Sequence, residues 1–170
     1  MNKKYITISF CIIAVVLVFT LVVAGVTKKD NTGNNNDISN PAVSEEVSLK
    51  TNEGSYTIKI NTVYDAEPLT DEENPPAADR VAVVVYEYTN DDISHGLSIG
   101  NTHFKAFDSK GTELQQYPQK DLFQASEIGE SGTFTASVAF ALNNTENSLI
   151  LEYYNDVSSV KPDTVYELNW

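Results

Sequence analysis

An unbroken run of β-branched and aromatic residues from Arg80 to Asn90, RVAVVVYEYTN, constrains the fold of this chain most strongly. Side chains on a strand alternate between two faces. Here both faces are apolar, because three valines lie on one face and Ala82, Val84, Tyr86 and Tyr88 lie on the other. A strand that is apolar on both faces needs cover on both, which an edge strand does not. The run therefore predicts a central strand around which the rest of the domain is built.

Short segments that alternate apolar and polar residues lie on both sides of this run, separated by turn-forming segments such as 108–111 and 129–132. The expected strands begin near Val47, Tyr56, Arg80, Thr102, Thr112, Thr133, Leu149 and Val165, and the last one ends at Trp170, which we expect to be packed. The acidic stretch 65–79, with its two adjacent prolines, is expected to be a long surface loop. About eight short strands without a helical period predict an all-β domain over residues 45–170, a two-sheet antiparallel sandwich of immunoglobulin-like type.

The beginning of the chain does not fit a soluble core. From Tyr5 to Val26 there is no charged residue, and two lysines flank the stretch on each side. As a helix that rises about 1.5 Å per residue, it would span roughly 30 Å, the thickness of the hydrocarbon core of a bilayer. Residues 1–29 are therefore expected to be one transmembrane helix that contacts the membrane through residues 5–26, or a signal peptide. A signal core has about 7–15 apolar residues, so the greater length here favours a retained anchor.

Residues 30–44 are rich in Asn, Gly, Ser and Asp and predict a flexible polar linker. From Asp30 onward the chain has 7 basic and 24 acidic residues, a net charge of −17. Such a surface is a poor partner for nucleic acid or anionic lipid, because phosphate binding needs clustered Lys and Arg. We expect a single-pass protein of the cell membrane with an extracytoplasmic C-terminal domain, or a secreted one if the signal is cleaved.

Four segments between Tyr56 and Tyr154 carry a resemblance: VVYEYTND, THFKAFDSKGTEL, GESGTFTASVAFAL and LILEYY. The valine-rich strand that ends in Thr-Asn, the hairpin with Asp-x-x-Gly and the glycine turn before an aromatic strand are similar to the immunoglobulin-like, telokin-like extracytoplasmic domains of Gram-positive bacteria. The resemblance implies a sandwich behind a lipoprotein signal or membrane anchor, and it implies no particular activity. The chain departs from lipoprotein members because its single cysteine, Cys11, follows the bulky Phe10 and forms no usable lipobox.

Two sets of side chains are candidate metal ligands. The first is His95 and His103 with Asp91 and Asp92, and the second is Asp71, Glu72, Glu73 and Asp79 in the acidic stretch. Zinc sites take three or four ligands of defined geometry, and calcium loops place their acids at alternate positions, so neither set matches a complete motif. We therefore expect ordinary surface residues at these positions, without a metal or a cofactor.

No stretch matches a Gly-x-Ser-x-Gly nucleophile elbow or a phosphate-binding glycine loop, so an enzyme is not expected. Tyr86, Tyr88, Tyr153 and Tyr154 lie on predicted strands, where they either pack in the core or form an exposed stripe for a protein partner. The expected function is a membrane-tethered, surface-exposed, non-enzymatic module for protein interaction or cell-envelope association. The alternative is an extracytoplasmic protein that binds a cation or small ligand through residues 65–79.

Overall fold

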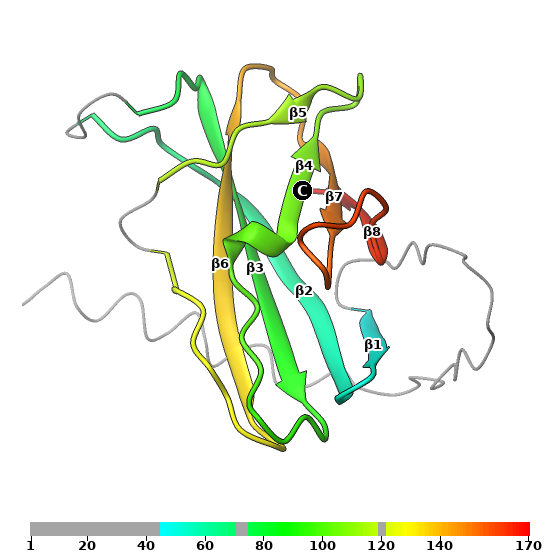
Figure 1. Cartoon of the computed structure of the whole chain (residues 1–170). Coiled ribbons are helices and arrows are strands. Elements are labelled where there is room, and N and C mark those ends of the chain that lie inside the picture. Colours follow the sequence, from blue (N-terminus) through cyan, green and yellow to red (C-terminus); the bar gives the residue numbers. More distant parts are fainter. Residues whose placement is uncertain (1–44, 71–74, 119–121) are drawn as a thin grey trace, which may run out of the picture. The chain divides into compact units, whose positions relative to one another are not determined.

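In the computed structural model, residues 45–70, 75–118 and 122–170 are described, and they form two antiparallel four-stranded sheets (Figure 1). The first sheet has the strand order β1-β2-β3-β6, and the second has the order β5-β4-β7-β8. The strands are β1 Glu46–Thr51, β2 Gly54–Ala66, β3 Arg80–Asn90, β4 Phe104–Phe107, β5 Glu113–Leu114, β6 Thr133–Leu142, β7 Ser148–Tyr153 and β8 Thr164–Asn169, and a 3-10 helix, Asn101–His103, precedes β4. The predicted two-sheet antiparallel sandwich is confirmed.

The predicted membrane anchor at residues 5–26 and the predicted linker at residues 30–44 lie outside the described residues. Among the residues that are described, none belongs to a helix of sufficient length and apolar character to cross a bilayer.

Strand β3 lies in the middle of the first sheet, as its sequence predicts. It pairs along its length with β2 on one side and with β6 on the other. Ala82, Val84, Tyr86 and Tyr88 are buried in the main core between the sheets. The outward Val81 and Val83 are buried as well, in a second cluster with its own cover. Both faces of the strand are thus covered, which explains why its sequence is apolar on both.

Strand β2 is longer than its sequence pattern predicts. The register with β3 shifts between Ile60 and Thr62, so a β-bulge there resets the alternation and places Val63 in the core. The strand then continues through Asp65 and Ala66, both of which pair with β3. The loop predicted to begin at residue 65 therefore begins at residue 67. The sequence pattern misses the end of the strand because the bulge interrupts the two-residue alternation of apolar and polar side chains.

The hairpin predicted over 102–117 is confirmed at its turn and shorter in its second arm. Asp108 Oδ1 accepts a hydrogen bond from the Thr112 N–H at 2.8 Å, and Gly111 has a φ of 79°. The bond from Thr112 lowers the pKa of the Asp108 carboxyl below its usual value. Only Glu113 and Leu114 pair with β4 before the chain crosses toward the other sheet.

The strand order differs from that of constant-type immunoglobulin domains. In those domains the third strand of the chain lies in the second sheet. Here β3 stays hydrogen-bonded to β2, and β4 is the first strand to cross. The sandwich architecture is confirmed, whereas the immunoglobulin-like assignment is not confirmed by this order.

A set of polar contacts, which we call the clasp, forms around the side chains of Asp65 and Arg80. The Asp65 carboxylate accepts hydrogen bonds from the Arg80 guanidinium at 2.7 and 2.6 Å and from the Trp170 indole N–H at 3.1 Å. The same guanidinium donates to Asn147 Oδ1 at 2.6 Å. Trp170 also packs against the main core, as predicted. The clasp thus joins β2, β3, the β6–β7 turn and the residue after β8.

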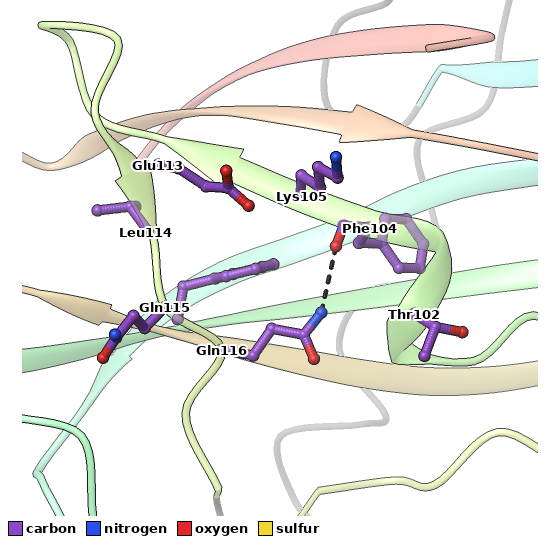
Figure 2. Close-up of a pocket in the computed structure, with 8 residues that line it drawn as sticks. Thr102, Phe104, Lys105, Glu113, Leu114, Gln115 and Gln116 are labelled. Carbon is purple, nitrogen blue, oxygen red and sulfur yellow. Dashed lines mark hydrogen bonds between the residues drawn. The ribbon is translucent and has the colours of Figure 1, made fainter. Parts of the chain in front are cut away.

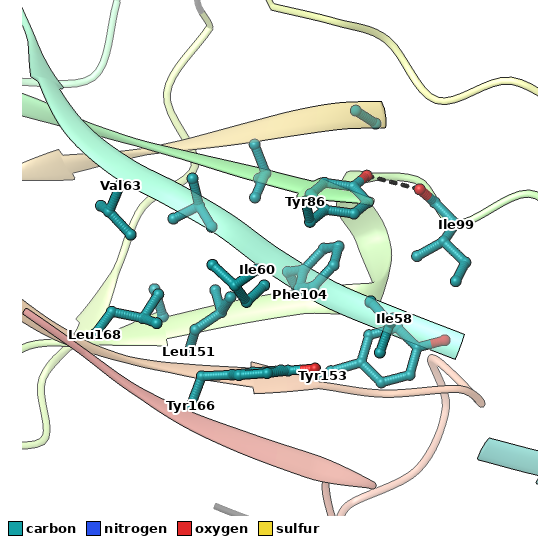
Figure 3. Packing of buried hydrophobic residues seen from close by; sticks show 14 of the residues in the cluster. Ile58, Ile60, Val63, Tyr86, Ile99, Phe104, Leu151, Tyr153, Tyr166 and Leu168 are labelled. Atoms are coloured by element: carbon teal, nitrogen blue, oxygen red, sulfur yellow. Dashed lines mark hydrogen bonds between the residues drawn. The ribbon is translucent and has the colours of Figure 1, made fainter. Parts of the chain in front are cut away.

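Buried tyrosines connect the long loops to the sheets (Figure 3). The Tyr86 hydroxyl donates to the backbone oxygen of Ile99 at 2.7 Å, in the loop after β3. The Tyr88 hydroxyl donates to the oxygen of Ser126 and accepts from its N–H, in the segment before β6. The Tyr56 hydroxyl donates to the Asn155 side chain at 2.8 Å, in the β7–β8 loop. Each of these loops is therefore anchored from inside the core.

We expect Val84→Asp to unfold the domain, because Val84 has no exposed surface and an unpaired buried carboxylate costs about 4 kcal/mol. Val83→Asp should have a similar effect through the second cluster. Val85→Asp is the matched control, since this side chain is only half-buried on the outer face of the same strand. Thermal melting followed by circular dichroism measures the difference, and parental melting of both buried variants would show that β3 is not central.

The tyrosine core also predicts loss of stability at high pH. Burial raises the pKa of the hydroxyls of Tyr56, Tyr86, Tyr153 and Tyr166. The folded pKa values lie above the unfolded value of about 10, so the stabilisation is complete below about pH 10 and is lost as the pH rises beyond it. We expect tyrosinate absorbance at 295 nm to stay below the value for all nine tyrosines until the β-sheet signal is lost. Complete ionisation with an intact β-sheet spectrum would contradict the buried hydroxyls.

Candidate functional site

The structure does not bring the predicted histidines and aspartates together. His95 Nε2 lies 3.3 Å from an exposed carboxylate oxygen of Glu53, in the β1–β2 turn. His103 Nδ1 instead lies 2.8 Å from a backbone oxygen after β7. Residues 91–92 lie against Ser55, whose hydroxyl donates to the Asp92 carboxylate at 3.0 Å. Within the described part of the chain, no group of three or more His, Cys, Asp or Glu side chains is placed to hold a metal ion.

The predicted calcium set is only partly visible. Residues 71–73 lie outside the described residues, and Asp79 is exposed, with its backbone N–H bonded to the oxygen of Leu142 at 2.9 Å. Asp65, at the start of the predicted loop, belongs to the clasp with Arg80 and Trp170. Cation binding by this stretch therefore stays a prediction.

The alternative of an exposed tyrosine stripe is wrong, and the core alternative is confirmed. Tyr86, Tyr88, Tyr153 and Tyr154 are all buried. The first three belong to the main core, where Tyr86 and Tyr153 both contact the Phe104 ring. Among the described residues, the large aromatic side chains that are exposed are Tyr64 and Phe123.

A second hydrophobic cluster lies on that outer face. Its buried members are Val81, Val83, Tyr117, Ala139 and Ala141, and Ala66, Leu69, Ala78 and Leu122 pack against them. The cover comes from the loop after β2 and from the chain that crosses after β5. The Tyr117 hydroxyl accepts a hydrogen bond from the Leu69 N–H at 3.0 Å, which joins the two covering segments.

Two large side chains are exposed at the border of this cluster. Tyr64 is 46% exposed and pairs with Val83, which pairs in turn with Ala139. Phe123 is 62% exposed. Its N–H donates to Ser137 Oγ, and its oxygen accepts from the Ser137 N–H, each at 2.9 Å, which holds it beside β6. Tyr64 and Phe123 are three strand spacings of about 4.8 Å apart and two residues apart along the strands, which places them roughly 16 Å from each other.

We call Tyr64, Phe123 and the half-buried Val85 between them the outer patch. The sequence does not single out either aromatic residue. Tyr64 follows the bulge that interrupts the alternation of β2, and Phe123 lies in a segment without any period. Tyr64 and Val85 share the outer face through the register of β2 and β3, and Phe123 comes near them because its backbone is bonded to Ser137 of β6.

The remaining outer face of the first sheet is polar and internally paired. By register, Lys59 lies between Glu46 and Glu87, so opposite charges stand beside each other on adjacent strands. Further along, the hydroxyls of Thr89 and Thr133 lie 2.9 Å apart. These residues are polar, which leaves the outer patch as the exposed apolar part of this face.

Two hollows lie along the crossing segment after β5. The larger has a volume of about 480 Å³ and is lined by Thr102, Phe104, Lys105, Glu113, Leu114, Gln115, Gln116 and Phe140 (Figure 2). The smaller, of about 330 Å³, shares Gln116 with it. Gln116 Nε2 donates to the backbone oxygens of Asn101 at 2.8 Å and Phe104 at 3.2 Å, so this amide fastens the crossing segment to β4. The hollows therefore arise where the chain passes between the sheets.

No protein-family model matches the sequence. No curated protein matches it either. Solved structures match it in three dimensions. The secreted protein MPT63 of Mycobacterium tuberculosis matches with a TM-score of 0.62 and 12% identity, over 77% of this chain and 98% of that protein.

Two proteins of Bacillus subtilis are similar as well. YcdA, described as a predicted lipoprotein, has a TM-score of 0.55 and 15% identity, over 74% of this chain and 39% of that protein. YjhA has a TM-score of 0.51 and 10% identity, over 75% of this chain and 98% of that protein. The likeness is one of fold. At these identities it shows the fold alone, an all-β sandwich that also occurs in a secreted protein and a predicted lipoprotein.

Proposed function

We propose that this protein is a non-enzymatic binding module, displayed outside the cell membrane by an anchor at residues 5–26, that binds another protein through the outer patch. The observation that carries the proposal is the exposure of Tyr64 and Phe123 at the border of a buried apolar cluster. Aromatic residues are enriched in protein interfaces, and large exposed apolar patches on a soluble domain mark interaction sites.

Rigid surroundings support this role. The segment that carries Phe123 is held to the sheets on both sides, by the Tyr88–Ser126 bonds and by the bond between Tyr117 and Leu69. Tyr64 lies on a strand that pairs with two others. A surface that is already ordered loses little conformational freedom on binding, so more of the contact energy remains as affinity.

An extracytoplasmic location is supported by the uncharged stretch at residues 5–26 and by the fold. Among the similar structures, MPT63 is a secreted protein and YcdA is a predicted lipoprotein. The assignment to telokin-like domains rests on turn and core motifs of the sequence, since the strand order differs from the constant-type immunoglobulin order. Cleavage after the uncharged stretch would make the same module a secreted one.

We expect a photo-crosslinking residue at position 64 or 123 to form a covalent adduct with one protein of the native cell. Positions 157 and 160 are matched controls, because these valines are 55% and 100% exposed on the β7–β8 loop. Adducts are identified by mass spectrometry after purification of the full-length chain. Equal adducts at all four positions, or none at positions 64 and 123, would remove the outer patch as the binding surface.

The location is tested with a single accessible cysteine. Val160→Cys places a thiol at a fully exposed position, and Cys11→Ser removes the native one. We expect a membrane-impermeant maleimide to label this variant in intact cells as completely as in lysed cells. The Val84→Cys variant is the control, because its buried thiol should stay unlabelled in both. Labelling of residue 160 only after lysis would place the domain inside the cell.

A further inference from the structure

Strand β1 is the outermost strand of the first sheet, and among the described residues no strand pairs with its outer edge (Figure 1). Its exposed side chains include those of Glu46, Ser48 and Lys50, whereas the alternate Val47 and Leu49 are half-buried and pack against the main core. An edge of this kind presents a row of backbone donors and acceptors to a further strand. Strand β1 is therefore a surface that another chain can extend.

The pairing of β2 determines which backbone groups of β1 point outward. The backbone oxygen of Ser55 accepts a hydrogen bond from the N–H of Asp91 at 3.1 Å, so the backbone of Ser55 faces the β3 side. Backbone groups of successive residues on a strand point to opposite edges, so those of Tyr56 face β1, where Leu49 is its partner. The backbone groups of β1 that point away from the sheet are consequently those of Glu46, Ser48 and Lys50.

The side chains of β1 are complementary to themselves about Ser48. When two copies of the strand pair antiparallel with Ser48 opposite Ser48, Glu46 of each copy lies opposite Lys50 of the other. The same register opposes Val47 and Leu49 on the inner face, where both are half-buried. Registers centred on Val47 or Leu49 instead set a charged residue opposite Ser48. Unlike charges and apolar pairs directly across two strands stabilise a sheet, so the register centred on Ser48 is favoured.

The charges on β1 determine which strand its outer edge accepts. Charged residues on an edge strand commonly prevent pairing. Here the two charges are of opposite sign and equally far from Ser48, so two copies related by a twofold axis attract each other. Glu46 also lies beside Lys59 in its own sheet, so acid and base would alternate across the junction, from Lys59 to Glu46 to Lys50 of the second copy. The edge thus matches a second copy of itself.

We propose that two copies of this chain pair antiparallel through β1, with Ser48 at the twofold axis, and so join their first sheets into one. The junction contains about six backbone hydrogen bonds, two for each opposed pair of residues whose backbone groups point outward. This contact is small beside the roughly 1,600 Å² that a stable complex buries. The inference therefore rests on the anchor proposed above, which confines both copies to one membrane and raises their effective concentration.

Pairing through β1 leaves the outer patch uncovered, so the inference goes beyond the function proposed above. Strand β1 forms one edge of the first sheet, and β6, beside which Phe123 is held, forms the other. A twofold axis perpendicular to the joined sheet turns the outer faces of both copies in the same direction. The dimer would thus present two outer patches on one face, and a partner with two matching sites would bind it more tightly than it binds a single copy.

The test uses the full-length chain with Cys11→Ser, reconstituted in phosphatidylcholine vesicles and oxidised with copper phenanthroline. A residue at the axis faces its own copy at a Cα separation of about 5.5 Å, which a disulfide can span. We expect Ser48→Cys to form a disulfide-linked dimer about tenfold faster than Thr135→Cys, an exposed position on β6 of the same sheet. Equal rates would overturn the proposal. Only chains that float with the vesicles are scored, which distinguishes failure of the anchor from failure of the strand pairing.

An exchange of charges tests the register. With Ser48→Cys in place, Lys50→Glu gives acids at both charged positions and Glu46→Lys gives bases at both. Each variant alone should crosslink about tenfold more slowly, because two ion pairs become two repulsions. A mixture of the two should recover the parental rate within a factor of about two, because each opposed pair then contains one acid and one base. Parental crosslinking by either variant alone, or no recovery in the mixture, would overturn the proposal.

Discussion

A buried tyrosine hydroxyl needs a hydrogen-bond partner, and this requirement organises the domain. The core contains several tyrosines, and the hydroxyls of Tyr56, Tyr86 and Tyr88 bond to loop atoms outside it. Replacing such a ring with phenylalanine would leave loop donors and acceptors unsatisfied, which costs about 1–3 kcal/mol per group. The same tyrosine side chains therefore pack the core and hold the loops in place. Tyr166 is the exception, since its buried hydroxyl has no partner among the described residues.

The apolar character of β3 also determines what lies on the outer face of the first sheet. Because β3 is apolar on both faces, its outward valines need cover, and the chain supplies it with two segments joined by the Tyr117–Leu69 bond. That cover ends at Tyr64 and Phe123, which remain exposed. The outer patch is thus the edge of an otherwise buried cluster. This explains why large apolar side chains can persist there without loosening the fold.

The sequence predicts the parts of the fold that depend on local pattern. The central strand at Arg80–Asn90, the turn at residues 108–111 and the inward face of β6 follow from alternation and turn chemistry alone. The parts of the fold that depend on pairing between residues far apart in the sequence cannot be predicted from local pattern. The β-bulge after Ile60 breaks the period of β2, and the crossing segment after Leu114 finds its partner on the other sheet.

The candidate surfaces escape sequence reasoning for the same reason. Tyr64 and Phe123 are distant in sequence, and each looks unremarkable in its own segment. Net charge indicates an acidic domain but not where the acids stand relative to apolar side chains. That relation is fixed by register, because a shift of one residue would move each side chain to the opposite face.

The proposed recognition by the outer patch depends on the residues around it. On the first sheet, the register places Lys59 between Glu46 and Glu87, so the recognition proposed above would depend on apolar area and shape. Since the sheets pack about 10 Å apart with their outer faces directed away from each other, a partner on one face does not obstruct the other. A partner bound at the outer patch would therefore leave the outer face of the second sheet uncovered.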